Sequence, residues 1–262
     1  MTVRDIYNYL DEIAPFENQS GSDNCGVIVG DFDTGVKKIL VCLDVTNDVV
    51  SEAVEKNADL IIAHHPLMYR PVSKIVNNDP LHALIRNNIG LIAIHTNIDV
   101  APGGVSDLML EKLGLPKSDK AILPINSKGF GYGRIAEIDK PITAKELAEK
   151  CKKAFNCTVF RYVDSGKPIK IIGVSSGSAA ESVDASLELG CDAFVCGEVK
   201  YDKILFAKNH GLTLIEAGHF HTEDIFCEDL VNRLKAKFSE LSIEKAENSK
   251  DVCDYGVFIS AD

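Results

Sequence analysis

Short apolar runs alternate with helical patterns along most of this chain. The runs predicted as strands are residues 25–29, 39–43, 60–63, 91–94, 169–174, 193–196 and 212–216. Two of the helical patterns begin with recognisable caps, because Thr143 with Glu146 fits a capping box and Asp79 before Pro80 fits an N-cap and first helical residue. Strands that alternate with helices are typical of βαβ units, so the sequence predicts an α/β fold with largely parallel sheets.

The two halves of the chain resemble each other. Residues 38–66 (KILVCLDVTNDVVSEAVEKNADLIIAHHP) are echoed by residues 170–198 (KIIGVSSGSAAESVDASLELGCDAFVCGE), and both fit strand, loop, helix, strand. A further helix and strand follow in each half, and each half then ends on a histidine with an acid four residues later. This repeat predicts two similar α/β domains. The Gly-rich stretch 126–134 marks the boundary, so we assign 1–126 to the first domain and 127–240 to the second, with 241–262 as a candidate to pack back on the first.

Composition and charge narrow the class of protein. The formal net charge of −11 disfavours nucleic acid and anionic membrane surfaces as partners. No apolar run approaches the ~18 residues of a membrane span, and the start of the chain does not fit a signal peptide, so a cytoplasmic protein is expected. The eight cysteines include no C-x-x-C pair and are expected to be reduced, buried and inert. The charged segment 235–251 is interpreted as a solvated helix end and loop.

Polar residues follow four of the predicted strands, which points to a shared site because ligands of α/β proteins bind at the carboxyl ends of strands. Imidazole and carboxylate groups without thiolate suit Zn²⁺, Mn²⁺, Fe²⁺, Co²⁺ or Ni²⁺. The predicted metal ligands are His64, His65, Asp99, His219 and Glu223.

A single tetrahedral ion with an open position needs fewer than five protein ligands. The five side chains fit two divalent ions that share a carboxylate. Adjacent histidines on a regular strand point to opposite faces, so His64 and His65 serve one site only if the backbone bends near Pro66. A helical turn brings His219 and Glu223 together, and Glu223 is our choice for the bridging ligand.

Other polar residues are left with more than one interpretation. His95 fits a partner of a metal ligand, a proton shuttle or a hydrogen-bonded strand-end histidine, and we keep it as a catalytic candidate. His221 fits surface exposure or a substrate contact, and it is the second catalytic candidate. Glu198 fits either a substrate-facing role or a structural ion pair. His82 and His210 lie on helical patterns away from strand ends and are expected to be structural.

The chain resembles a family of dinuclear-metal proteins known as GTP cyclohydrolase I type 2 homologues, or the Nif-three-like family. The resemblance covers nearly the whole chain and rests on SDNCGVIVGD, LDVT, AHHPLMYRPVSKI, AIHTNIDVAPGGVSDLML and CDAFVCGEVKYDKILFAKNHGLTLIEAGHFHTE. It implies that the metal ligands are the same five residues. It also implies two interlinked α/β domains, a short form without the inserted middle domain of longer relatives, and a hexameric toroid whose metal sites face an internal cavity.

Two classes of function follow as hypotheses. The first is a metal-dependent hydrolase that uses a metal-bridging hydroxide, for which the family name suggests opening of a purine ring, although nothing in the sequence identifies guanine. A nucleotide or another small molecule is the expected substrate. The alternative is a non-enzymatic protein that stores or delivers metal, or an oligomeric scaffold. A measurable turnover on a physiological substrate would decide between the two.

Overall fold

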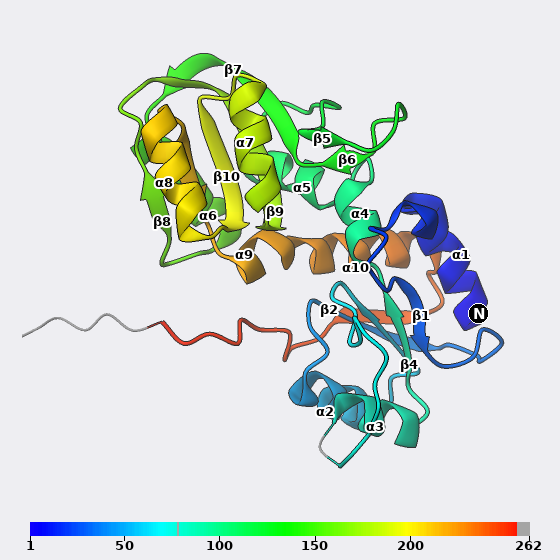
Figure 1. Ribbon diagram of the computed structural model, residues 1–262. Helices are drawn as coiled ribbons and strands as arrows, with labels where there is room; N and C mark the ends of the chain where they lie inside the picture. The colour runs from blue at the N-terminus through cyan, green and yellow to red at the C-terminus, as the bar shows by residue number, and fades with distance from the viewer. Residues whose placement is uncertain (78, 256–262) are drawn as a thin grey trace, which may run out of the picture.

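The computed structural model describes residues 1–77 and 79–255, which form two α/β units (Figure 1). The first unit is built on a five-stranded sheet of order β1-β4-β3-β2-β12. Strands β4, β3, β2 and β12 run parallel, and β1 is an antiparallel edge strand. The bounds are β1 Gly26–Val29, β2 Lys38–Cys42, β3 Leu60–Ala63, β4 Gly90–Ala93 and β12 Ser242–Lys245.

Helices cover both faces of the first sheet, because its strands β3 and β4 are wholly apolar and buried. Alternate residues of β2 point to opposite faces of the sheet. Ile39 and Val41 pack against α1 and α10 on one face, whereas Leu40 and Cys42 pack against α2 and α3 on the other. A fully buried side chain of this size stabilises the fold by about 1.5–3 kcal/mol, so the sheet is the main source of stability in this unit. The helices here are α1 Val3–Ile13, α2 Asn47–Glu55, α3 Pro80–Arg86 and α4 Thr96–Val100, and a short 3₁₀ turn at Phe16–Asn18 follows α1.

The second unit has the same layered plan. Its sheet has the order β7-β9-β10-β11-β8, with the central three strands parallel and both edges antiparallel. Helix α6 packs on one face of this sheet, and α7 and α8 pack on the other. A two-stranded ribbon, β5 with β6, precedes it. The bounds are β5 Leu123–Pro124, β6 Gly131–Tyr132, β7 Arg134–Ile142, α6 Ala144–Phe155, β8 Arg161–Val163, β9 Ile169–Ser178, α7 Ala180–Glu188, β10 Ala193–Glu198, α8 Tyr201–His210, β11 Thr213–Glu216 and α9 His219–Glu223.

The two units exchange helices. Helix α5 (Val105–Lys112) follows the first sheet in sequence, yet its Met109 and Leu110 belong to the core of the second sheet. Helix α10 (Ile225–Lys237) follows the second sheet, yet its Phe226 and Leu230 belong to the core of the first. Figure 1 shows α10 lying between the units. The packing units are therefore interlinked and are not continuous in sequence.

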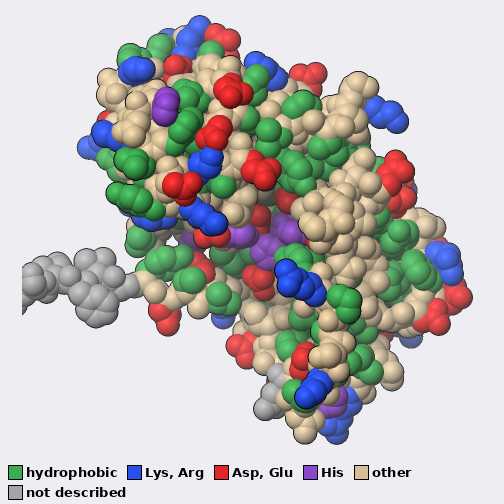
Figure 2. Space-filling model, in the orientation of Figure 1, with side chains coloured by type: hydrophobic (Ala, Val, Ile, Leu, Met, Phe, Trp, Pro, Cys, Tyr) green, Lys and Arg blue, Asp and Glu red, His purple; other side chains and the backbone are tan. Residues whose placement is uncertain are grey.

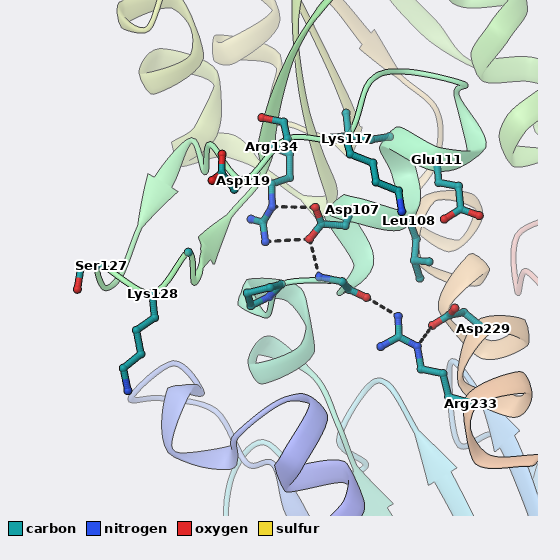
Figure 3. A pocket seen from close by; sticks show the side chains of 15 residues that line it. Asp107, Leu108, Glu111, Lys117, Asp119, Ser127, Lys128, Arg134, Asp229 and Arg233 are labelled. Atoms are coloured by element: carbon teal, nitrogen blue, oxygen red, sulfur yellow. Dashed lines mark hydrogen bonds and ion pairs between the residues drawn. The ribbon is translucent and has the colours of Figure 1, made fainter. Parts of the chain in front are cut away.

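A polar network ties the exchanged helices together beside a cavity of about 890 Å³ (Figure 3). The buried guanidinium of Arg134 donates to both carboxylate oxygens of Asp107, through Nε at 3.1 Å and Nη2 at 3.0 Å. Asp107 accepts from the backbone N–H of Gly103, whose carbonyl accepts from Arg233 on α10. Because these charges are already paired, the network is best explained as a structural link between α5, α10 and β7.

The strands and helix caps predicted from the pattern of apolar and polar residues are present in the structure. Every predicted strand is present, and β9 continues beyond the expected end at residue 174 to Ser178. The capping box at Thr143 and the N-cap at Asp79 are also confirmed. The strands β5, β8 and β12 were not predicted, because they are short or carry charged residues on an exposed side.

Two predictions were wrong in part: that segment 235–251 is a solvated helix end and loop, and that all cysteines are buried. Within segment 235–251, expected to be helix end and loop, β12 pairs in parallel with β2 and Ile243 is buried. This pairing places the start of segment 241–262 on the first sheet, whereas residues 256–262 lie outside the described residues. The cysteines are all free, but Cys25 is half-buried and Cys253 is exposed, because it lies in the C-terminal segment beyond the last strand. Among the described residues no helix is long and apolar enough to cross a bilayer.

Candidate metal centre

His64 and His65 emerge from the buried strand β3, and both imidazole rings reach one site. Their backbone N–H groups donate to the carbonyls of Cys42 and Leu43, which continues the pairing with the neighbouring strand. The ring centroids are only 5.1 Å apart. Nε2 of His65 lies 3.0 Å and Nε2 of His64 lies 3.8 Å from the same carboxylate oxygen, Oε2 of Glu223. The predicted convergence of two adjacent histidines is therefore present.

The other three predicted ligands come from two short helices at strand ends. Asp99 lies on α4, directly after β4, and its Oδ1 is 3.6 Å from Nε2 of His64. His219 and Glu223 begin and end the single turn of α9, which places Nε2 of His219 2.9 Å from Oε2 of Glu223. Figure 2 shows histidine side chains gathered where the two units meet. Both halves of the repeat thus contribute to one centre.

The donor atoms divide into two sets that share one carboxylate. His65, His219 and Glu223 form one set, and His64, Asp99 and Glu223 form the other; within each set the donor atoms lie within 4.8 Å of one another. Two imidazoles with one carboxylate, and one imidazole with two carboxylates, are donor sets that divalent transition metals accept. The sharing of Glu223 is what a bridging ligand between two ions requires.

Two buried atoms in this centre have no hydrogen-bond partner among the described residues. They are Nε2 of His64 and Oδ1 of Asp99. A buried polar atom without a partner costs about 1–3 kcal/mol, and more when it is charged. A cation placed between these two atoms would satisfy both, so the residues present fit a metal centre.

The Nδ1 atom of each of these three histidines also contacts an acceptor oxygen. Nδ1 of His65 lies 2.7 Å from Asp44 Oδ1, and Nδ1 of His219 lies 3.1 Å from Glu198 Oε1. Nδ1 of His64 lies 3.0 Å from the carbonyl oxygen of Ile94. An acceptor at Nδ1 places the proton there and leaves Nε2 as a lone-pair donor, which is the arrangement typical of metal-binding histidines.

Comparison with known proteins identifies the family and the fold of this chain. The family described as Duf34/NIF3 (NGG1p interacting factor 3) matches residues 1–251. The chain belongs to the Duf34/NIF3 family. Relatives named "GTP cyclohydrolase 1 type 2 homolog" include a Clostridium perfringens protein, 36% identical with 85% of this chain and 87% of that protein covered, and a Clostridium acetobutylicum protein, 34% identical with 85% of each covered. The crystal structure of a Staphylococcus aureus hypothetical protein superposes with a TM-score of 0.90 at 29% identity, over 97% of this chain and 99% of that one. The mixed α/β fold with mostly parallel sheets is thus that of NIF3 structures.

Electrostatics at the centre of this Duf34/NIF3 chain favour protonated histidines when no cation is bound. Burial lowers the pKa of His65, but hydrogen bonds to Asp44 and Glu223 outweigh it and raise the pKa to about 10. The hydrogen bond to Glu223 raises the pKa of His219 to about 9. Burial raises the pKa of the Glu223 carboxyl, but its three histidine partners outweigh burial and hold the pKa well below the usual range. A bound cation would replace these protons.

The pKa of the Asp99 carboxyl is shifted in the opposite direction to that of Glu223. Burial raises the pKa of the Asp99 carboxyl, and the nearby charge of Glu223 adds to that effect against the histidines. Two carboxylates that share a buried site repel each other unless a cation or a proton lies between them. The pair Asp99 and Glu223 is therefore a further feature that suits a cation.

The two catalytic candidates lie in different places. His95 belongs to the centre, since its ligand atom falls within 4.8 Å of those of His64 and His65, and its Nδ1 contacts both oxygens of Asp23 at 2.9 Å. His221 points elsewhere, toward Asp251 of the C-terminal segment, with Nε2 3.6 Å from Oδ2. His82 on α3 and His210 on α8 take no part in the centre.

Asp23 and Asp44 were not predicted as functional residues, and Glu198 was predicted with two interpretations. Asp44 follows β2 and Glu198 ends β10, so both lie at carboxyl ends of parallel strands beside the strands that carry the histidines. That placement was a usable signal, because the carboxyl ends of neighbouring parallel strands meet at one edge. Asp23 lies in the loop before β1, and no periodic pattern marks it.

Proposed function

We propose that this protein is a hydrolase that depends on two divalent metal ions. The carboxylate of Glu223 carries the proposal, because it belongs to both donor sets and three histidine nitrogens converge on it. The donor set of imidazole and carboxylate suits Zn²⁺, Mn²⁺, Fe²⁺, Co²⁺ or Ni²⁺, among which cellular supply decides. When bound, such a pair of ions acidifies water and polarises an electrophilic centre.

The residues around the ions have separate tasks in this proposal. His64, Asp99 and Glu223 would hold one ion, and His65, His219 and Glu223 would hold the other. Asp44 and Glu198 keep the imidazoles of His65 and His219 in a fixed orientation. Pre-organised ligands reduce the reorganisation that the reaction needs, which is the main contribution of a protein scaffold to such chemistry.

His95 is our candidate for proton transfer. The carboxylate of Asp23 accepts the proton of Nδ1 and is itself held by the backbone N–H of Thr96 at 3.1 Å. Burial raises the pKa of the Asp23 carboxyl, but hydrogen bonds from His95 and Thr96 outweigh burial and hold the pKa below the usual range, so Asp23 stays ionised. A ring nitrogen of His95 lies within 4.8 Å of ligand atoms of His64 and His65, which is close enough for a proton-transfer group beside the ions.

The proposed substrate and the proposed oligomeric state rest on similarity to relatives. The relatives are named for GTP cyclohydrolase, so GTP is the first compound to test for ring-opening hydrolysis. A homo-oligomer, expected from the family resemblance to be a hexameric toroid, is proposed with the metal centres facing its interior. Its mass in solution is the direct check.

Elemental analysis of untagged protein, purified without chelator, tests the metal centre. Wild type should contain about two equivalents of a first-row metal per chain. The double variant His219→Ala with Glu223→Gln should lose both, whereas the control His82→Ala with Glu55→Gln, on helices away from the centre, should retain them. Less than one equivalent in wild type after reconstitution would contradict the proposal.

A turnover measurement separates the enzyme from the alternative function. Metal-loaded protein is supplied with GTP and with a panel of phosphoesters and cyclic amides, and product formation is followed with and without chelator. Turnover that disappears in His219→Ala with Glu223→Gln supports the hydrolase. Two exchangeable ions without turnover on any compound would favour metal storage, delivery or a scaffold.

A further inference from the structure

The chain continues beyond β12 as an irregular segment, residues 246–251, which we name the C-terminal strap. Its first backbone N–H, that of Ala246, donates to the carbonyl of Val41 at 2.8 Å. The backbone N–H groups of residues 247 and 248 donate to the two carboxylate oxygens of Glu52 at 2.8 and 2.9 Å. In Figure 1 the segment leaves β12 and runs below α9. These bonds fix the start of the strap to β2 and α2.

The strap contacts the end of β2 beside a partner of a predicted metal ligand. The hydroxyl of Ser249, a residue only 8% exposed, accepts the backbone N–H of Leu43 at 3.0 Å. The next residue is Asp44, whose Oδ1 lies 2.7 Å from Nδ1 of His65. Each residue adds only two soft backbone dihedrals, so a fixed amide at Leu43 limits where Asp44 can lie. Ser249 therefore acts, through Asp44, on the orientation of the His65 ring.

The other end of the strap contacts α9. Oδ2 of Asp251 lies 3.6 Å from Nε2 of His221, and the two side chains are only 17% and 19% exposed, so water screens this pair less than a surface pair. The hydroxyl of Tyr255 donates to the same carboxylate oxygen at 2.8 Å, which helps to fix its position. In the single turn of α9, His221 lies midway between His219 and Glu223. Asp251 therefore contacts the turn that carries two predicted ligands.

A third contact lies at the junction of α9 and α10. Lys245, the last residue of β12 before the strap, forms an ion pair with Asp224. Asp224 directly follows Glu223 in sequence. The chain that enters the strap is thus bound to the residue next to the carboxylate that both donor sets share.

The contacts of the strap favour one of the two donor sets. Ser249 and Asp251 act beside the ligands of the set formed by His65, His219 and Glu223. Across the residues that the structure describes, no hydrogen bond or ion pair joins the strap to β4 or α4, the elements beside Asp99 of the other set. The favoured set also combines a ligand after β3 of the first sheet with two ligands after β11 of the second, so it depends on a link between the units.

We propose that the C-terminal strap positions the ligands of the ion bound by His65, His219 and Glu223, with Ser249 and Asp251 as its positioning residues. This proposal rests on the two-ion centre of the proposed hydrolase. Metal ligands need to be held close to their productive geometry by surrounding contacts, and loss of such contacts weakens metal binding. His221, a catalytic candidate from the sequence, is in this proposal a positioning residue that touches neither ion.

Metal titration of strap variants tests the proposal. Metal-free, full-length protein is titrated with Co²⁺ against a chromogenic chelator. Ser249→Ala removes the acceptor for the Leu43 N–H, and Asp251→Asn removes the charge that faces α9. Each should weaken one of the two equivalents by about tenfold and change the other by less than about twofold. Ser249→Thr retains the hydroxyl and should bind both ions as wild type does. Ser242→Ala, exposed on β12, and Asp33→Asn, on the surface, are matched controls and should also bind both ions normally.

Two background variants identify which ion the strap affects. Asp99→Asn keeps the set with His65 and His219 complete, and His219→Ala keeps the set with His64 and Asp99 complete. Adding Ser249→Ala should weaken the ion that remains in Asp99→Asn by about tenfold and leave the ion that remains in His219→Ala unchanged. A strap that served only the general stability of the fold would weaken both ions alike.

Several outcomes would overturn the proposal. Equal weakening of both ions, unchanged affinity in Ser249→Ala and Asp251→Asn, or failure of Ser249→Thr to restore binding would each contradict it. The metal content of wild type separates it from the proposed function. Wild-type protein that binds no metal after reconstitution contradicts the two-ion centre itself and the strap's role with it. Wild-type protein that binds two ions, with unaltered affinities in the strap variants, contradicts the role of the strap alone.

Discussion

Gly177 leaves the space that the carboxylate of Glu223 occupies. A Cβ atom at Gly177 would lie 2.0 Å from Oε1 of Glu223 and 3.3 Å from Nε2 of His219. Gly177 also has a φ of +55°, which L side chains rarely adopt. Its backbone N–H donates to Thr222 Oγ1 at 3.2 Å, so the strand cannot simply withdraw. The position of Glu223 in both donor sets therefore depends on a glycine in β9.

Gly177→Ala is expected to displace Glu223 and to weaken the binding of both ions by at least about tenfold. The matched control is Gly190→Ala, because Gly190 has a φ of +80° but no atom within 4 Å of its Cβ position. The control should cost only backbone strain of about 1–2 kcal/mol. Competition against a chromogenic chelator gives the affinities, and equal metal affinity in the two variants would show that the space at Gly177 is unimportant.

Asp99→Asn and His219→Ala should each remove a different ion. Asp99 belongs only to the set with His64, and His219 belongs only to the set with His65. Each variant should retain about one equivalent of metal, because the other donor set stays complete: His65, His219 and Glu223 in Asp99→Asn, and His64, Asp99 and Glu223 in His219→Ala. Co²⁺ absorption spectra should then differ between the variants, since the remaining ligands differ. Loss of both ions in either variant would indicate that the two positions bind as one unit.

Metal uptake should release protons below pH 9. The pKa is about 10 for His65 and about 9 for His219 without metal, so both imidazoles are protonated at pH 7.5 and must lose their protons to bind an ion. Titration calorimetry in two buffers of different ionisation enthalpy counts the protons. His219→Ala should release fewer protons than wild type, and a count of zero in wild type would refute the assigned charge states.

The same two pKa values set how the stability of the metal-free protein depends on pH. Both lie above the value of ~6.5 for an unfolded histidine, so the stabilisation is fully present below pH 6.5 and is lost as pH rises through 9 and 10. The Tm of metal-free protein should therefore fall between pH 7 and pH 10 more steeply than that of His65→Ala with His219→Ala. Equal slopes would contradict this account.

Much of the fold and the centre followed from the sequence because strand ends are easy to locate. The wholly apolar run 60–63 had to be a buried strand, so the polar groups after it, His64 and His65, had to lie at its carboxyl end. The helix exchange was not predictable. Helices α5 and α10 have apolar faces, but an apolar face does not specify which of two sheets it covers.

The partners of the histidines were harder to predict than the ligands. Asp44 and Glu198 act through hydrogen bonds to Nδ1 atoms, and such contacts depend on the order of strands in the sheet. Strand order is a non-local property that hydrophobic periodicity does not contain. Asp23 reaches His95 across 72 residues of sequence from an irregular loop, so only the folded chain shows it.

Asp23→Asn tests the proton-transfer role of His95. An amide at position 23 keeps the shape of the side chain but removes the charge that stabilises a protonated imidazole. If His95 moves a proton, kcat should fall by about 10²–10⁴-fold, the range for general acid–base catalysis, while about two equivalents of metal remain. Asp33→Asn, whose exposed carboxylate pairs with Arg4 on the surface, is the control and should leave kcat unchanged. Loss of metal in Asp23→Asn would instead assign His95 to the ligand set that includes His64 and His65.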